Sequence, residues 1–320
     1  MGVVSIWVAD PTHTMTRWNI AIVGAIAALV VWTSGPGAQT ADAPRTAWGA
    51  PDLSGIWDYR SLTPLSRLEA FKDRAVLSEE ESSAFVRGFQ QNRERFAPPF
   101  QRAFVDRGDT TVPDRRSSLI IDPLTGRYPR PVPGATQRRA ASIGSYRTDG
   151  FDSHEDLNFI DRCLGTMGFP MVPGPYNNNV QIFQTPDTVA ILSESVHLAR
   201  IIPLDGRPHA GLPQFSGDGR GHWEGDTLVV ESMNFDGELT MIGTEPRGMV
   251  ERFTRVGDMM EYEFTVDDPE MWEATWTARV PMRRTDAPLF EYACHEGNYS
   301  VANILTTARA EDRAAVAGSR

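Results

Sequence analysis

The stretch ERFTRVGDMMEYEFTVDD, residues 251–268, decides the fold. After Gly257 and Asp258, every second position is apolar, and these apolar residues are Met260, Tyr262, Phe264 and Val266. Polar residues lie between them, which is the period of two expected for a strand with one buried face and one exposed face. Glycine and aspartate are typical turn residues. The stretch therefore predicts a β-hairpin.

Similar strand patterns continue through the C-terminal half of the chain. They occupy residues 179–195, 196–206, 221–235, 274–282 and 288–296, with short turns between them. Many short strands without intervening helices are typical of an antiparallel sandwich or barrel. We expect a mainly β, lipocalin-like antiparallel barrel, with the N-terminal third wrapped around it and a C-terminal helix after Ser300.

Two local patterns precede the predicted barrel. Residues 77–96 predict a helix, because Ser78 and Glu81 have the spacing of a capping box and apolar residues share one face. Residues 117–129 lie within a Pro-, Arg- and Gly-rich region and predict a small hairpin around Asp122-Pro123.

The organisation of the chain follows from these patterns. Residues 1–43 read as a signal peptide, since Arg17 precedes the apolar run NIAIVGAIAALVVW at residues 19–32. Residues 44–160 form the expected wrapping segment, and residues 161–320 form the barrel core with its helix. We expect a periplasmic or secreted bacterial protein, which touches a membrane only through the signal segment if that segment is not cleaved.

The charge of the chain excludes several classes of partner and chemistry. The formal net charge is −11 and the sequence pI is about 5.1, whereas proteins that bind nucleic acid usually present a basic surface. Lys72 is the single lysine, so Schiff-base chemistry and a P-loop have almost no residue to use. We expect no nucleic-acid partner and no cofactor.

The two cysteines, Cys163 and Cys294, form an even pair in an exported chain. An oxidising compartment favours a disulfide between them. Two buried, inert thiols are the alternative, and a catalytic thiolate is the third possibility.

Several motifs together resemble a large, mostly uncharacterised family of secreted bacterial proteins. They are WGAPDLSGIW, SLIIDPLTGRYP, IIPLDGRPH, GRGHWEGDTLVVESMNF, VERFTRV, TVDDPEMW and YACHEGNY, and they span nearly all of the chain after the signal segment. This resemblance implies export and a common fold. In addition, Gly55-Ile56-Trp57 resembles the G-x-W opening of lipocalins, whose barrels hold small, often apolar molecules in their mouths.

The stretch FEYACHEGNYSVANIL, residues 290–305, carries the first candidate chemistry. If residues 288–296 form a strand, Glu291 and His295 share one face, and a carboxylate near the imidazole would make His295 a general acid or base. Glu296 is a second possible assistant. The structural alternative is a corner that is fixed by a disulfide, a turn at Gly297 and a helix cap from Asn298 or Ser300.

The stretch RPHAGLPQFSGDGRGHWEGD, residues 207–226, carries the second cluster. Arg207, His209 and His222 are candidates for orienting a substrate, and Trp223 is either a further contact or a core residue. The histidines match no zinc-binding spacing, so no metal ligand is assigned.

The stretch PGPYNNNVQIF, residues 173–183, carries the third cluster. Tyr176 and Asn178 could supply donors and acceptors to a polar pocket. The asparagines could equally form a left-handed turn before the next strand.

These observations lead to one expected function and two alternatives. The expected function is an exported enzyme that acts on a small organic molecule in the barrel pocket by His/Glu acid–base chemistry, as a lyase, hydratase or isomerase. The alternatives are a non-catalytic periplasmic binding protein for an apolar small molecule and a metal-dependent hydrolase. The sequence contains no G-x-S-x-G, G-x-G-x-x-G or C-x-x-C motif, which disfavours serine hydrolases, Rossmann dehydrogenases and thioredoxin-like enzymes.

Overall fold

A computed structural model describes residues 43–96, 105–135, 151–157, 161–164, 169–235 and 247–318. The expected signal segment lies outside these residues except for its last position. By its internal contacts the chain divides into residues 1–39 and 40–320, and the description below concerns the second unit. Within the described residues, no helix has both the length and the apolar character needed to cross a membrane.

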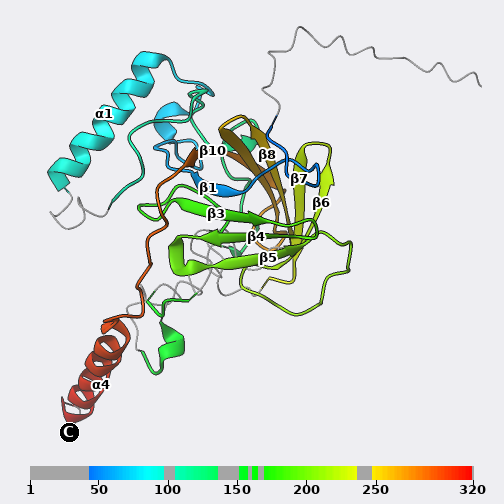
Figure 1. Ribbon diagram of the computed structural model, residues 1–320. Coiled ribbons are helices and arrows are strands. Elements are labelled where there is room, and N and C mark those ends of the chain that lie inside the picture. Colours follow the sequence, from blue (N-terminus) through cyan, green and yellow to red (C-terminus); the bar gives the residue numbers. More distant parts are fainter. Residues whose placement is uncertain are drawn as a thin grey trace, which may run out of the picture. The chain divides into compact units, whose positions relative to one another are not determined.

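The protein is mainly β (Figure 1). The helices are α1 (Glu79–Phe96) and α4 (Ser300–Gly318), and short 3-10 turns are η1 (Glu69–Phe71), η3 (His154–Asp156) and η4 (Ser195–His197). The strands are β1 (Gly55–Asp58), β2 (Ile120–Asp122), β3 (Asn179–Gln184), β4 (Thr188–Ser193), β5 (Ala199–Pro203), β6 (Asp218–Glu224), β7 (Thr227–Met233), β8 (Gly248–Val256), β9 (Met259–Asp267) and β10 (Trp276–Thr285).

The strands form a nearly closed antiparallel barrel. Their order is β5-β4-β3-β1-β10-β9-β8-β7-β6, and β2 adds to β10 outside this path. The first and last strands of the order, β5 and β6, lie beside each other and complete the barrel wall. The expectation of an antiparallel barrel with a C-terminal helix is confirmed. The strand β1 pairs with both β3 and β10, so residues before position 160 supply part of the wall.

Glycines allow β5 and β6 to approach where the barrel closes. A Cβ atom at Gly221 would lie 2.6 Å from Leu204 Cδ2 and 3.0 Å from Ile202 Cγ2. Gly219, two residues earlier, also faces Ile202. Ile202 on β5 and Leu204 just after it therefore occupy the space that a larger residue on β6 would need. This packing covers the junction, where the described residues form no strand ladder.

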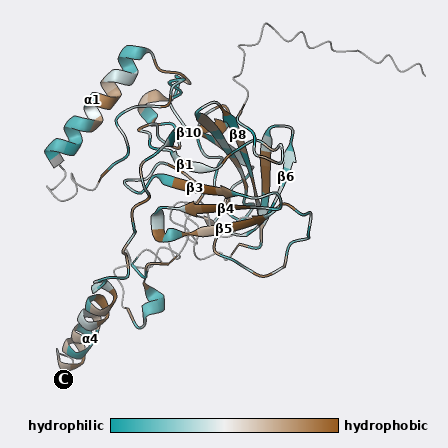
Figure 2. Ribbon diagram, viewed as in Figure 1, coloured by the Kyte–Doolittle hydropathy of each residue, from teal (hydrophilic) through white to brown (hydrophobic). Residues whose placement is uncertain are grey.

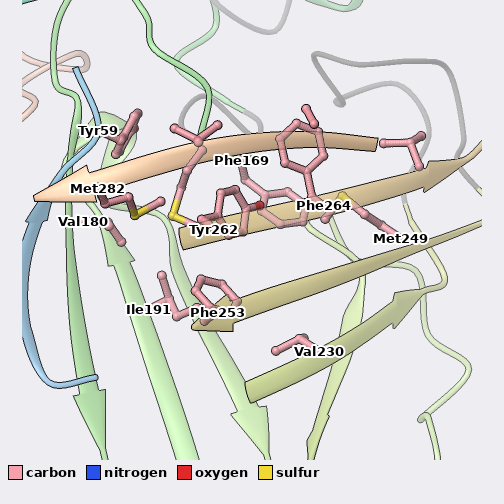
Figure 3. Close-up of a cluster of buried hydrophobic side chains, with 14 of the residues drawn as sticks. Tyr59, Phe169, Val180, Ile191, Val230, Met249, Phe253, Tyr262, Phe264 and Met282 are labelled. Carbon is pink, nitrogen blue, oxygen red and sulfur yellow. The ribbon is translucent and has the colours of Figure 1, made fainter. Parts of the chain in front are cut away.

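Side chains fill the barrel interior (Figure 3). The predicted hairpin is confirmed, since β8 and β9 pair through the turn at Gly257, and the inward positions of β9 are buried as the period of two requires. Large aromatic residues are fully buried in this core: Trp57, Tyr262, Phe264 and Trp276 have no solvent exposure. Figure 2 shows that hydrophobic residues are concentrated on strands such as β4 and β5. Burial of these large apolar side chains is the main force that holds the barrel together.

One predicted hairpin and one predicted strand are wrong, although β2 lies within the first of these segments. Residues 117–129 form no hairpin, because their backbone pairs with other segments: Ile120 N donates to Leu65 O, and Arg279 N donates to Leu119 O. Residues 288–296 form no strand either. Their backbone donors bind side chains instead, as with Phe290 N, which donates to Glu194 Oε1 at 2.9 Å.

The helix starts follow the sequence closely. Ser78 and Glu81 make the reciprocal capping-box bonds, with Glu81 N donating to Ser78 Oγ at 3.2 Å and Ser78 N donating to Glu81 Oε2 at 2.9 Å. At α4, Ser300 N donates to Asn298 Oδ1 at 3.2 Å. Both contacts satisfy backbone donors that a helix start leaves without an intrahelical partner.

Candidate binding pocket at one end of the barrel

One end of the barrel is covered by residues 169–178, here called the roof segment. At this end β1 finishes opposite the start of β3, with Asp58 beside Asn179, and β4 finishes opposite the start of β5. Phe169 and Met171 of the roof segment are buried in the core. The hairpin turns after β3, β6 and β8 lie at the opposite end. The covered barrel end is called the roofed end below.

A pocket of about 200 Å³ lies at the roofed end. Its lining comes from the segment after β1, the loop after residue 105, the roof segment and the start of η4. Aromatic rings and prolines predominate, with a few polar groups among them. The lining residues are Tyr59, Leu65, Arg107, Tyr128, Pro170, Val172, Pro173, Gly174, Pro175, Tyr176, Asn177, Asn178 and Ser195.

Asn178 fixes the shape of the roof segment. Its Oδ1 accepts from Gly174 N at 2.6 Å, and its Nδ2 donates to Asp106 O at 2.9 Å and to Gly174 O at 3.2 Å. Asp106 N also donates to Pro175 O at 2.6 Å, which joins the same two segments. The Asn178 side chain is buried and bound to the backbone, so it holds the pocket wall in place rather than presenting free donors to a ligand.

The asparagine run contains a residue with left-handed backbone geometry beside the pocket. Asn177 lines the pocket and has a φ of 53°, in the left-handed region that asparagine tolerates. On the other side of the pocket, Ser195 precedes Val196 and His197, which both have a φ of 50°. A β-branched residue rarely adopts this conformation, and such backbone strain is concentrated at functional sites.

Tyr59 forms the inner wall of the pocket. It is almost fully buried, and its hydroxyl donates to Asn177 O at 3.4 Å. Burial, and next the nearby negative charge of Glu194, raise the pKa of Tyr59 well above its ordinary value. Tyr59 therefore stays protonated and can only donate or accept hydrogen bonds at neutral pH. Tyr128, a second wall, stacks on Trp272 with 4.8 Å between ring centroids.

The segment of residues 290–299 runs beside the pocket. Besides the bond from Phe290 to Glu194, Tyr292 N donates to His197 Nε2 at 3.3 Å. The Tyr292 ring stacks on the ring of Tyr176 with 6.2 Å between centroids. Burial is the main cause that raises the pKa of Tyr292 to about 12. The negative charge that Tyr176 carries when ionised, and a hydrogen bond with Tyr176, raise the pKa further toward this value. Tyr176, which the sequence predicts as a substrate contact, lines the pocket, and its ring stacks on the ring of Tyr292.

The disulfide between Cys163 and Cys294 is confirmed, with a Cα–Cα distance of 5.7 Å. It joins residues 161–164 to the segment that precedes α4. Asn298 reinforces this junction, because its Nδ2 donates to Asp161 O at 2.8 Å and to Cys163 Sγ at 3.2 Å. Disulfides form in oxidising compartments, so this bond fits a location outside the cytoplasm.

The residues predicted to be catalytic do not line the pocket. Glu291, His295 and Glu296 are all exposed, and within the described part of the chain no hydrogen bond or ion pair involves their side chains. The strand that would align Glu291 with His295 does not form. Gly297 adopts a φ of 69°, as the predicted turn requires. These contacts support the structural alternative of a tied corner, and they lend no support to a proton relay.

The predicted substrate contacts of the second cluster also lie away from the pocket lining. Arg207 is exposed and paired with Asp205. His209 Nδ1 lies 3.5 Å from Asp218 Oδ2, and His222 Nε2 lies 3.3 Å from Glu224 Oε1. Trp223 packs against the core, which was the structural alternative for it.

The same residues include the histidines that could have bound a metal ion. Within the described ranges, no group of three His, Cys, Asp or Glu side chains is arranged to hold a metal ion. Three histidines lie beside separate groups: His209 beside Asp218, His222 beside Glu224, and His197 beside the amide of Tyr292.

A buried charge network near the roofed end was not foreseen from the sequence. Arg200 on β5 binds Glu251 on β8 through two parallel bonds, Nη1 to Oε1 at 2.9 Å and Nη2 to Oε2 at 2.5 Å. Tyr262 donates to Glu251 Oε1 at 2.8 Å, and Arg200 also donates to Ser232 Oγ at 3.2 Å. The Arg200 guanidinium lies 3.8 Å from the ring centroid of Phe169 in the roof segment.

The periodicity of the strands contains a pattern that could have predicted this network. Glu251 occupies an inward position between Met249 and Phe253, and Arg200 precedes the inward Ile202 by two residues. A charge at an inward position of a strand costs free energy unless it is paired. Two such charges of opposite sign therefore indicate a buried ion pair.

No family model and no curated protein matches the chain. The barrel with its C-terminal helix is thus established by the structure, and the family resemblance of the motifs remains a hypothesis.

Proposed function

We propose that the protein is an exported carrier that binds a small, partly apolar organic molecule in the pocket at the roofed end. The observation that carries this proposal is the pocket itself, about 200 Å³ with a lining of tyrosines, prolines and Val172. Ligand sites are usually concave and mostly apolar, with a few polar groups that orient the ligand. The usual volume of such sites is roughly 300–1,000 Å³. This pocket is smaller than that range, so it suits a small molecule of one or two rings.

The polar groups of the pocket lining favour ligand binding without catalysis. Tyr59 stays protonated, and the Asn178 side chain is already bound to the backbone on both of its polar atoms. No carboxylate or imidazole belongs to the lining residues, whereas acid–base catalysis needs such a group within hydrogen-bond reach of the reacting atom.

Export is part of the same proposal. The apolar run of residues 19–32 has the character of a signal segment, and the disulfide suits the periplasm or the extracellular medium. The motifs shared with secreted bacterial proteins support the same location.

The test uses 2-naphthamide, a neutral two-ring probe, in an isothermal titration with the purified, disulfide-bonded protein. We expect saturable binding at one site. Replacing Val172 with Trp fills the pocket and should abolish binding, whereas Val250→Trp on the outer face of β8 should leave binding unchanged. Thermal melts of both variants check that the fold is retained. Equal binding by the wild type and Val172→Trp would move the site elsewhere and overturn the proposal.

The acid–base enzyme is the rival proposal, with His295 as its proton carrier. The loss of turnover in a His295→Gln variant would favour this enzyme over the carrier.

A further inference from the structure

We infer that the pocket selects molecules that join an aromatic ring to an anionic group such as a carboxylate, and that Arg107 binds this anion. The inference rests on the proposed function and names the class of ligand for the same site. It comes from one charge in the lining that no described group of the protein neutralises.

Arg107 is the cation among the pocket-lining residues. Within the described residues, its guanidinium makes no hydrogen bond, ion pair or ring contact. Arg107 is exposed, and partial desolvation lowers the pKa of its guanidinium below the ordinary value, although an arginine remains charged at neutral pH. The guanidinium therefore keeps five donors in a planar fork that matches the two oxygens of a carboxylate.

Two acidic residues near the pocket are bound by other groups. Asp106, next to Arg107 in the chain, receives a bond from Arg60 Nη1 at 2.6 Å. Glu194 receives bonds from Asn179 Nδ2 and from Phe290 N, both at 2.9 Å. In the structure neither carboxylate pairs with Arg107. Among the described residues, the guanidinium of Arg107 is therefore left without an anionic partner, and the anion of a ligand can bind it.

The charges also give the ligand an orientation. Glu194 is close enough to Tyr59 to raise the pKa of its hydroxyl, so an anion is disfavoured at the Tyr59 wall. The ring of the ligand then faces the apolar wall of Tyr59 and Tyr128, and its anion faces Arg107. The protein as a whole carries a formal charge of −11, which repels anions in general. A preference for an anionic ligand must therefore come from a local group such as Arg107.

The test compares 2-naphthoate with 2-naphthamide, which have nearly the same shape and differ in charge. We expect 2-naphthoate to bind about 10- to 100-fold more tightly, as is typical of a charge-assisted hydrogen bond. In an Arg107→Met variant the ratio of the two affinities should fall to about one, because the variant lacks the charge that distinguishes the carboxylate from the amide. Arg107→Lys should keep part of the preference, because the charge remains but the planar fork is lost.

Arg247→Met is the control for the loss of one positive charge, because Arg247 is exposed, paired with Asp267 and not among the lining residues. It should leave both affinities unchanged. If both probes bind the wild type equally and Arg107→Met changes neither, the inference fails and the carrier proposal stands. If neither probe binds, the carrier proposal fails as well.

Discussion

Two arginines near the same end of the barrel have opposite environments. Arg200 is buried, and its guanidinium is bound by Glu251, by Ser232 and by the face of the Phe169 ring. Arg107 lines the pocket and has no such partner among the described residues. The comparison separates two uses of one side chain. A guanidinium whose donors are all bound can hold strands together, whereas one with unused donors can bind a ligand.

The largest expected effect is the loss of one member of the buried pair. Glu251→Gln leaves the Arg200 charge inside the barrel without a carboxylate, and removal of one partner from a buried pair typically costs about 3–5 kcal/mol. We expect the free energy of unfolding, measured by urea denaturation, to fall by that amount.

The control is the exposed pair on the outer face, where Arg252 Nη2 donates to Glu224 Oε2 at 2.8 Å. Glu224→Gln should have a much smaller effect, because solvent screens exposed ion pairs. Replacing both buried partners, as Arg200→Met with Glu251→Leu, should recover part of the lost stability. Similar losses for Glu251→Gln and Glu224→Gln would show that burial does not distinguish the two pairs.

The disulfide gives the next largest effect and concerns the segment beside the pocket. The Cys163→Ser and Cys294→Ser double variant frees a cross-link that spans 131 residues of sequence. Disulfides typically contribute about 2–4 kcal/mol, mainly by restricting the unfolded chain. We expect urea denaturation of the oxidised protein and of the double variant to differ by this amount. An unchanged midpoint would mean that the contacts of Asn298 and Glu194 hold the segment without the cross-link.

The difference between neighbouring residues and residues that are far apart in the chain explains what the sequence could predict. The period-two pattern of residues 259–267 and the turn at Gly257 depend on neighbouring positions, so the hairpin could be derived directly. The pocket could not, because it joins Tyr59, Arg107 and Tyr176 from three segments that are far apart in the chain. Tyr176 was found only as a polar candidate, and Arg107 has no local pattern that separates it from the many other arginines.

The error at residues 288–296 has a related cause. The alternation of apolar and polar residues there fits a strand, but a strand also requires a neighbour with free backbone groups. The amides of Phe290 and Tyr292 bind the side chains of Glu194 and His197 instead. Only the folded barrel brings these side chains together, so local periodicity gave the wrong structure.

A smaller effect concerns alkaline pH and the tyrosine beside the pocket. The pKa of Tyr292 is raised from 10.0 to about 12 in the folded protein. Between these values the unfolded chain loses the proton while the folded protein keeps it, so stability should fall as pH rises from about 10 to 12. Tyr292→Phe removes this contribution, and its unfolding free energy should depend less on pH across that range. Urea denaturation at several alkaline pH values measures the difference, and identical slopes for the two proteins would contradict it.

The smallest expected effect is that of His295→Gln. The His295 side chain is exposed, and in the described part of the chain no carboxylate or backbone group binds it. Because it neither lines the pocket nor closes a network, the variant should match the wild type in urea denaturation and in affinity for 2-naphthamide. Arg107→Met, by contrast, should change the affinity for 2-naphthoate without a comparable change in stability. A His295→Gln variant with altered affinity would place the imidazole at the ligand and return acid–base chemistry to consideration, since only a side chain that reaches the ligand can transfer a proton to it.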